Sequence, residues 1–398
     1  MNALNKIVNP FARFFGAIKE NFKFKHYANY SLILPICALF AALGYAGVLK
    51  RSSANMFTQM AFAVILAVSL NFVVGFLGEL SLGHAGFMCI GAYVGTYFTN
   101  LLNPLLGSKL LSLLIAMVIG GVCAALFGFI VGLPALRLKG DYLAIVTLAF
   151  GEIVRNLFMN METFGGAVGL KNAYPYGKML FVVAFVVMIL TLVVFQNLVR
   201  SKHGRAITAI RDNEIAAKAM GINVTFYKLF AFTVAAFFAG VAGVLYGGFS
   251  PLVKFTTFSY NYSIEILVMV VLGGMGSING SILSAVFLTY LNITLMAKLP
   301  GNLSAVRYLI YALILILVVL YNNAPKLAPV REKYNAEFVK NKLRALVRRT
   351  RTPATEDDDA AAWANIPTKI TMDEIISVDL TPRTPDVGDK PTSQQKGD

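Results

Sequence analysis

Repeated runs of apolar residues constrain the fold of this chain more than any other feature of its sequence. A helix needs about 20 mostly apolar residues to cross the ~30 Å hydrocarbon layer of a bilayer. Charged residues make up 14% of the chain, against about 25% in soluble proteins. This composition excludes an ordinary soluble enzyme, and we predict an all-α polytopic membrane protein. The ten predicted transmembrane helices cover residues 31–48, 54–77, 82–102, 110–133, 141–158, 178–198, 226–249, 261–276, 279–297 and 304–321.

The distribution of positive charge predicts how these spans are oriented. Cytoplasmic loops of membrane proteins carry an excess of Lys and Arg. With ten spans, both termini lie on one side of the membrane, and that side holds 26 of the 35 Lys and Arg residues when Lys228 is counted with its adjacent loop. Both termini are therefore predicted to be cytoplasmic. The basic residues flank hydrophobic spans and do not line one soluble face, so a nucleic-acid partner is not expected.

The two ends of the chain differ from the predicted transmembrane domain at 31–325. Residues 1–30 place basic and aromatic side chains at helical spacing, which predicts an amphipathic helix on the cytoplasmic leaflet or against neighbouring membrane helices. Residues 326–351 form a basic juxtamembrane segment. The acidic tail at 352–398 is predicted to be disordered, and its Trp363 belongs either to a docking motif or to an inert tail.

The common signatures of enzymatic chemistry are missing from the sequence. It contains no G-x-x-x-x-G-K-[ST] phosphate-binding motif, so ATP hydrolysis would require another chain. Its three cysteines, Cys37, Cys89 and Cys123, lie inside apolar runs and are expected to pack as small hydrophobic residues. No nucleophile–base or metal-binding pattern is present. We expect no catalytic residues and no metal site.

Ionisable and polar residues within the spans are the first candidates for a translocation pathway, because burying them is costly unless they pair or face water. Glu79, Ser81 and His84 lie at a span boundary with Gly83, where glycines permit either a broken helix or an interfacial hairpin. The candidates for the pathway are Glu79, Ser81, Gly83, His84, Glu152, Arg155 and Glu265.

Alternatives remain open for the deeper charges in this set. Glu152 and Arg155 are three residues apart on one helix and can pair along its face, which favours a structural role over contact with a solute. Glu265 lies a few residues into its span and is a candidate for facing an outer vestibule. Glycines at 273–280 leave open a tight hairpin or a broken helix there.

The loop at 199–225 is too long and too regularly patterned to be a simple connector. Alternating apolar and charged residues predict a short helix, a turn and a second helix that ends near Gly221. A projecting helical pair with a small-residue face at Ala216–Ala217 suits docking into a groove of another protein, and a helix on the lipid surface is the alternative. The candidate coupling residues are Arg205, Arg211, Glu214, Ala216, Ala217 and Gly221.

Five blocks of the sequence resemble, in the same order, the LivM type of permease subunit from ABC importers of branched-chain amino acids. They lie at residues 70–93, 133–158, 163–170, 201–223 and 268–288. The fourth block, SKHGRAITAIRDNEIAAKAMGIN, resembles the loop of that family that couples to the ATPase subunits, with Glu214, Ala216, Ala217 and Gly221 at the motif positions. The chain departs from the family pattern at 321–325 and in its long C-terminal extension.

The resemblance implies a type II ABC importer permease fold in the cell membrane. It also implies a second, LivH-like permease, two cytoplasmic ATP-binding subunits and an extracytoplasmic substrate-binding protein as partners. ATP and magnesium would be bound by the ATPase subunits, with no cofactor in this chain. A related branch of the family imports urea or short-chain amides, which is one alternative. A proton-coupled secondary transporter using Glu152 or Glu265 is a more distant one.

Overall fold

The computed structural model describes residues 51–135, 140–174 and 176–298, together with Leu313 and Ile316. The predicted spans at 31–48 and, apart from these two residues, 304–321 lie outside the described residues. So do the predicted amphipathic segment at 1–30, the basic segment at 326–351 and the acidic tail at 352–398. The described residues all belong to one compact unit, Met1–Asn323.

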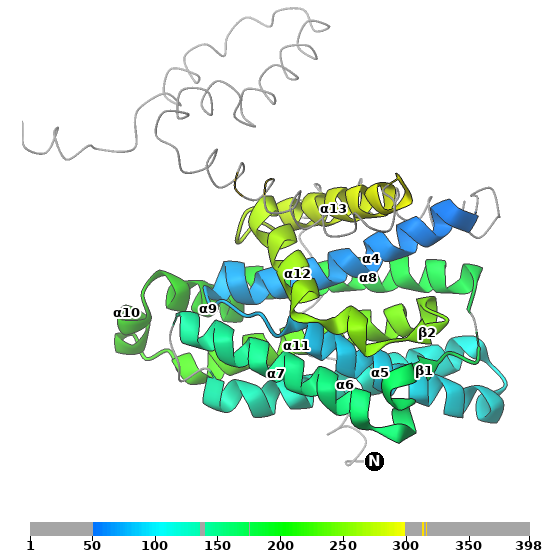
Figure 1. Cartoon of the computed structure of the whole chain (residues 1–398). Helices are drawn as coiled ribbons and strands as arrows, with labels where there is room; N and C mark the ends of the chain where they lie inside the picture. The colour runs from blue at the N-terminus through cyan, green and yellow to red at the C-terminus, as the bar shows by residue number, and fades with distance from the viewer. Residues whose placement is uncertain (1–50, 136–139, 175, 299–312, 314–315, 317–398) are drawn as a thin grey trace, which may run out of the picture. The chain divides into compact units, whose positions relative to one another are not determined.

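The described residues form long helices joined by short connections (Figure 1). Two short strands, β1 (Leu170–Lys171) and β2 (Leu252–Val253), pair antiparallel, with Leu170 opposite Val253. Three 3₁₀ turns, η2 (Glu162–Phe164), η3 (Gly166–Val168) and η4 (Phe255–Phe258), lie in the connections. The helices are α4 (Arg51–Asn71), which continues as the π-helix η1 (Phe72–Leu77), α5 (His84–Leu106), α6 (Lys109–Ala135), α7 (Asp141–Asn160), α8 (Lys178–Arg200), α9 (Lys202–Asp212), α10 (Glu214–Ala219), α11 (Val224–Phe249), α12 (Tyr260–Gly273) and α13 (Ile278–Lys298).

Helical segments occupy eight of the ten predicted spans. Among the described residues, five helical segments are long and apolar enough to cross a membrane: Ser52–Leu77, Lys109–Pro134, Asp141–Asn160, Met179–Arg200 and Val224–Phe249. The predicted span at 261–276 contains a helix that is too short to cross the apolar layer by itself. Helix α12 has 14 residues there, which corresponds to about 21 Å of helix and is shorter than the ~30 Å apolar layer.

Three glycines bring the helices α5, α6 and α11 into direct backbone contact. A Cβ atom on Gly91 of α5 would overlap with the carbonyl oxygen of Gly240 in α11. A Cβ atom on Gly240 would lie 2.8 Å from the carbonyl oxygen of Gly120 in α6, and one on Gly120 would lie 3.2 Å from that of Gly91. Small residues permit such close packing where apolar lipid supplies no hydrophobic driving force between helices.

The outward faces of α6, α7 and α8 are apolar. Large exposed side chains on these helices include Val118, Val122, Leu126, Ile130, Ile145, Ile153, Val186 and Leu190. An apolar surface of this extent is unfavourable in water and favourable in contact with lipid chains. The described region is therefore part of a multi-pass membrane protein.

Helix α5 begins inside the protein rather than at its surface. Gly78, with a φ of 82°, ends η1, and residues 78–83 are not helical. His84 Nε2 then lies 2.9 Å from Ser69 Oγ in α4. Ser69 lies about 12 Å of helix before Leu77, the last residue of η1. The chain therefore turns back alongside α4 before α5 starts. Ser81 and His84 are buried, which agrees with the predicted break in the helix and not with a hairpin in water.

Helix α12 begins part-way along α7 and not beside the end of that helix. The backbone N–H of Tyr260, at its first residue, donates to Glu152 Oε1 at 2.8 Å. Glu152 precedes the end of α7 at Asn160 by about 12 Å of helix. The N–H of Ala85 in α5 donates to Ser263 Oγ in α12 at 3.1 Å, so the two interrupted helices begin next to each other.

Candidate functional site

The segment at 199–225, which we call the coupling segment, folds as two short helices. Ser201 accepts hydrogen bonds from the N–H groups of His203 and Gly204 at the start of α9. Asn213 accepts 3.0 Å bonds from Ile215 and Ala216 at the start of α10. These side chains satisfy backbone donors that a helix start leaves free. The predicted helix–turn–helix is confirmed; α10 ends at Ala219, and Gly221 follows with a φ of 80°.

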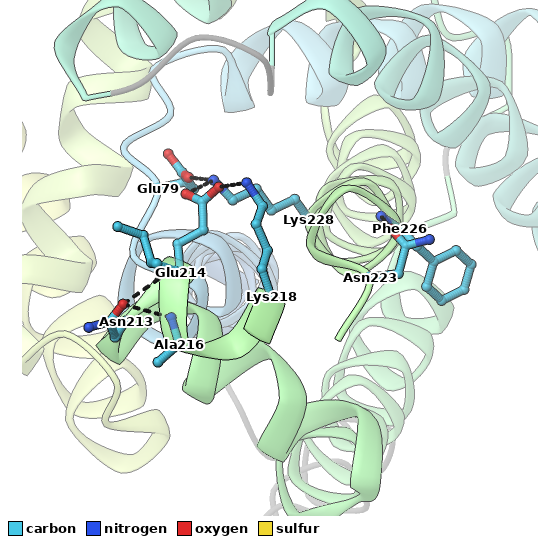
Figure 2. Close-up of polar contacts among 9 residues, drawn as sticks. Glu79, Asn213, Glu214, Ala216, Lys218, Asn223, Phe226 and Lys228 are labelled. Carbon is cyan, nitrogen blue, oxygen red and sulfur yellow. Dashed lines mark hydrogen bonds and ion pairs between the residues drawn. The ribbon is translucent and has the colours of Figure 1, made fainter. Parts of the chain in front are cut away.

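A buried lysine connects the coupling segment to the break before α5 (Figure 2). Lys228 Nζ, from the first turns of α11, contacts Glu79 Oε1 at 2.5 Å and Glu214 Oε2 at 3.2 Å. Glu214 Oε1 also pairs with Lys218 Nζ at 2.9 Å. The side chains of Lys228, Glu79 and Glu214 are 5%, 13% and 26% exposed. We call Glu79, Glu214, Lys218 and Lys228 the charge cluster.

The charges around Glu214 favour its ionised form. The hydrogen bond from Lys218 lowers the pKa of Glu214 most strongly, and Lys228 lowers it further. Partial burial acts in the opposite direction without cancelling this effect. Glu214 is therefore a carboxylate at neutral pH, as the ion pairs in the charge cluster require.

A second connection runs from the coupling segment to the π-helix η1. Arg211 Nη1 donates to the carbonyl oxygen of Gly75 at 3.0 Å. One turn earlier, Asn71 accepts from Gly276 N at 2.9 Å and donates to the carbonyl oxygen of Ser277 at 3.1 Å. The glycine turn between α12 and α13 is thus held against the junction of α4 and η1, and η1 is held against the coupling segment.

A polar cavity of about 370 Å³ lies away from the coupling segment, between α4, α11, α12 and α13. The first residues of α12 and the segment before it form part of its wall. Its described lining residues are Gln59, Phe62, Ala63, Tyr246, Thr256, Thr257, Ser259, Tyr262, Glu265, Met269, Thr289 and Asn292.

Comparison with known proteins identifies the family to which this architecture belongs. Residues 52–319 match the family described as branched-chain amino acid transport system / permease component. The chain belongs to this permease family. The match covers most of the described helices, the charge cluster and the cavity.

Curated relatives agree with this assignment. The permease is 35% identical to the high-affinity branched-chain amino acid transport system permease protein LivM of Salmonella typhimurium, over 69% of this chain and 74% of the relative. It is 37% identical to LivM of Escherichia coli, over 64% of this chain and 66% of that relative. Probable LivM of Methanocaldococcus jannaschii is 26% identical over 65% of this chain and 88% of its own length. No solved structure matches the chain significantly.

Family membership identifies the chain as the membrane-embedded transport subunit and not as an enzyme. No group of three or more His, Cys, Asp or Glu side chains suited to a metal ion occurs within the described ranges. Cys89 and Cys123 are free thiols within helices, as expected of packing residues.

The structure places the predicted coupling residues on both faces of the coupling segment. Arg205 is exposed and donates to the carbonyl oxygen of Arg200 at 3.1 Å. Ala216 is exposed, but Ala217 is buried, so the predicted Ala216–Ala217 docking face is wrong for Ala217. The apolar side chains that α10 does expose are Ile215, at 81%, and Met220, just after it, at 83%.

The predicted pathway residues separate into different environments. Glu79 belongs to the charge cluster, whereas Ser81 and His84 are buried further along the same segment. A Cβ atom on Gly83 would lie 2.5 Å from the carbonyl oxygen of Thr147 in α7, so this glycine allows close packing. Sequence reasoning missed Lys228, Asn71 and Gly75, which connect these parts.

Glu152 and Arg155 form the predicted ion pair, with Nε and Oε2 2.9 Å apart. Glu152 also accepts the hydrogen bond from Tyr260 N, and the Arg155 guanidinium lies 5.9 Å from the centre of the Phe255 ring. These contacts hold η4 and the start of α12 against α7. The structural interpretation of the pair is therefore favoured, whereas Glu265 lines the cavity.

Proposed function

We propose that this permease forms the transmembrane pathway of an ATP-driven importer for branched-chain amino acids. The coupling segment carries the proposal: it presents exposed apolar side chains at Ile215 and Met220, and buried charges tie it to an interrupted helix of the membrane domain. The names of the LivM relatives support the substrate class.

The proposed assembly contains a second, LivH-like permease, two ATP-binding subunits and a substrate-binding protein that delivers the amino acid. ATP and magnesium would be bound by the ATP-binding subunits. In this arrangement the permease lies in the cytoplasmic (inner) membrane with ten spans and both termini in the cytoplasm. The coupling segment then faces the cytoplasm, which agrees with the positive charge on this side of the sequence.

The proposed coupling mechanism is movement of the coupling segment as a stiff lever. Closure of the ATP-binding subunits moves α10, and Glu214 passes this movement to Lys228 and Glu79 through their ion pairs. Arg211 passes it to η1 at Gly75. Any ligand, ATP included, shifts the equilibrium between two states of the transporter only as far as its affinity for those two states differs. The candidate role of Arg205, Ala216 and Gly221 is to shape the docking surface.

The two alternatives are less well supported. A urea or short-chain amide importer is not favoured, because the LivM relatives are named for branched-chain amino acids. A proton-coupled carrier would have no use for a docking segment, and Glu152 is engaged with Arg155 and Tyr260.

Co-purification of the tagged chain in mild detergent tests the proposal. We expect a second permease and ATP-binding subunits to accompany the wild-type chain. Ile215→Asp and Met220→Asp place charge on the proposed docking surface and should release the ATP-binding subunits. Val168→Asp is the matched control, since Val168 is 76% exposed on a connection remote from the coupling segment. A chain that purifies alone, or docking variants that retain the ATP-binding subunits as the control does, would contradict the proposal.

A further inference from the structure

We propose that Asn71 is a positioning residue that makes the hairpin of α12 and α13 move with the coupling segment during transport. This inference rests on the proposed function and adds a second route by which the coupling segment acts on the membrane domain. The first route, through the charge cluster, ends at the break before α5. The second route ends at the glycine turn at 274–277, which joins α12 to α13.

Asn71 binds the backbone of this turn through its side-chain amide. The side chain belongs to the last residue of α4 and is fully buried. Its oxygen accepts a hydrogen bond from the N–H of Gly276 at 2.9 Å, and its nitrogen donates to the carbonyl oxygen of Ser277 at 3.1 Å. An amide that is bonded through both its donor and its acceptor fixes how the turn lies against α4.

The backbones of the turn and of η1 are in direct contact. A Cβ atom on Gly75 would overlap with the backbone nitrogen of Gly276. A Cβ atom on Gly276 would lie 3.3 Å from the carbonyl oxygen of Gly75. Packed interiors transmit strain, and here no flexible side chain lies between the two backbones to absorb it. A displacement of η1 therefore displaces the turn.

Arg211 connects this contact to the coupling segment. Its side chain passes over Gly78, where a Cβ atom would lie 2.7 Å from Arg211 Cγ, and its Nη1 donates to the carbonyl oxygen of Gly75 at 3.0 Å. The same Nη1 would lie 3.4 Å from a Cβ atom on Gly276. One guanidinium group thus lies against both η1 and the turn. The π-helical form of η1 agrees with such a role, since π-helical turns occur frequently at functional sites.

The two helices of the hairpin are closely packed against each other. A Cβ atom on Gly273 of α12 would overlap with the carbonyl carbon of Gly280 in α13. Ser284 Oγ in α13 donates to the carbonyl oxygen of Met269 in α12. We therefore expect α12 and α13 to follow the turn as one unit. Movement of the turn then reaches the start of α12, where Ser263 accepts from the N–H of Ala85 in α5.

Leucine transported per ATP hydrolysed tests this role in the complete, reconstituted transporter. Asn71→Leu keeps a side chain of similar size without hydrogen-bonding atoms. We expect the ratio to fall about tenfold, which corresponds to about 1.4 kcal/mol and is similar to the net contribution of one or two hydrogen bonds. ATP hydrolysis should continue, because the docking surface is unchanged.

Asn103→Leu is the matched control. Asn103 is also buried, and its side chain binds Tyr176 and Ser112. It lies 19 residues after the first residue of α5, which corresponds to about 28 Å of helix. Asn103→Leu should therefore lose hydrogen bonds within the membrane domain and keep the wild-type ratio.

Pulsed electron paramagnetic resonance between spin labels at Met275 and Leu133 measures the movement itself. Met275 lies in the turn and Leu133 near the end of α6, and both side chains are exposed. The labels are attached to cysteines at these positions in a chain whose own three cysteines are replaced by alanine. We expect trapping of ATP with vanadate to change the distance between the labels in the wild type and in Asn103→Leu, but not in Asn71→Leu. A residue that only stabilised the fold would not have this effect.

Arg211 provides a second test that leaves the buried amide intact. Arg211→Gln should also lower the transport ratio, and Arg211→Lys, which keeps a charged donor, should retain more of it. If Asn71→Leu does not fold, Arg211→Gln with the same label pair decides the question. A wild-type complex that takes up no leucine would refute the proposed function. A wild-type ratio in Asn71→Leu or Arg211→Gln, or a label distance that responds to ATP equally in Asn71→Leu and the wild type, would overturn the positioning role alone.

Discussion

Replacing Lys228 with methionine is the sharpest test of the charge cluster. Methionine keeps an unbranched side chain of similar length but removes the cation between Glu79 and Glu214. Removing one partner of a buried ion pair is strongly destabilising, because the remaining charge stays buried without compensation. Glu79 and Glu214 are 13% and 26% exposed, so water stabilises them slightly. We therefore expect a loss of about 3 kcal/mol, at the low end of the range for buried pairs.

The matched control is Lys218→Met, which removes a cation from the same Glu214. The Lys218 side chain is 60% exposed, and exposed ion pairs contribute about 0–1 kcal/mol. The midpoint of thermal unfolding of the purified complex should fall clearly in Lys228→Met and little in Lys218→Met. Amino acid transported per ATP hydrolysed should also fall in Lys228→Met, because the coupling segment loses its link to the membrane domain.

A third variant separates charge from packing. Lys228→Met combined with Glu79→Gln and Glu214→Gln leaves no buried charge without a partner, and we expect it to recover most of the lost stability. It should not recover coupling, because the ionic link remains absent. If Lys228→Met behaves like Lys218→Met, or if the triple variant is no more stable than Lys228→Met, the argument from buried charge is wrong.

Three further predictions concern the same region and the start of α12. Asn213→Ala removes the cap of α10 and should cost about 1 kcal/mol of local stability, seen as faster amide hydrogen exchange in Glu214–Ala219. Because the folded-state pKa of Glu214 is lowered, its ion pairs add stability above the unfolded pKa of about 4.3. That contribution is lost as the pH falls through the lower folded-state pKa. The midpoint of thermal unfolding should therefore change less between pH 6 and 3 in Glu214→Gln than in the wild-type protein. Glu152→Ala removes the acceptor for Tyr260 N and the partner of Arg155, and should lower the midpoint more than Glu162→Ala does.

Sequence patterns predicted the long helices well and the interrupted ones poorly. Runs such as 110–133 and 226–249 coincide with α6 and α11, because length and hydropathy alone decide whether a helix spans a membrane. Length and hydropathy do not show how deep in the protein a helix begins. The glycines at 78 and 274 indicated a break in each helix, but contacts such as Ser69 with His84 were needed to show that α5 starts inside.

The candidate site was only partly predictable, because spacing along the sequence indicates contacts within one helix but not contacts between distant segments. Ion pairs within one helix, Glu152 with Arg155 and Glu214 with Lys218, follow from spacing. Lys228 and Glu79 lie 149 residues apart, and Asn71 and Gly276 lie 205 apart. No local pattern relates residues at such separations. The sequence shows Lys228 only as a charge beside a loop, although its side chain is buried.

The contact of Gly91, Gly120 and Gly240 limits how this permease can change shape. Where backbones touch, there are no side chains whose rotation would let one helix slide past another. We expect α5, α6 and α11 to move as a single rigid body during transport. Opening and closing would then be confined to the helices that pack around this body, above all the short α12 and its partner α13. Cross-links among the three rigid helices should be harmless to transport, whereas a cross-link between α12 and α4 should stop it.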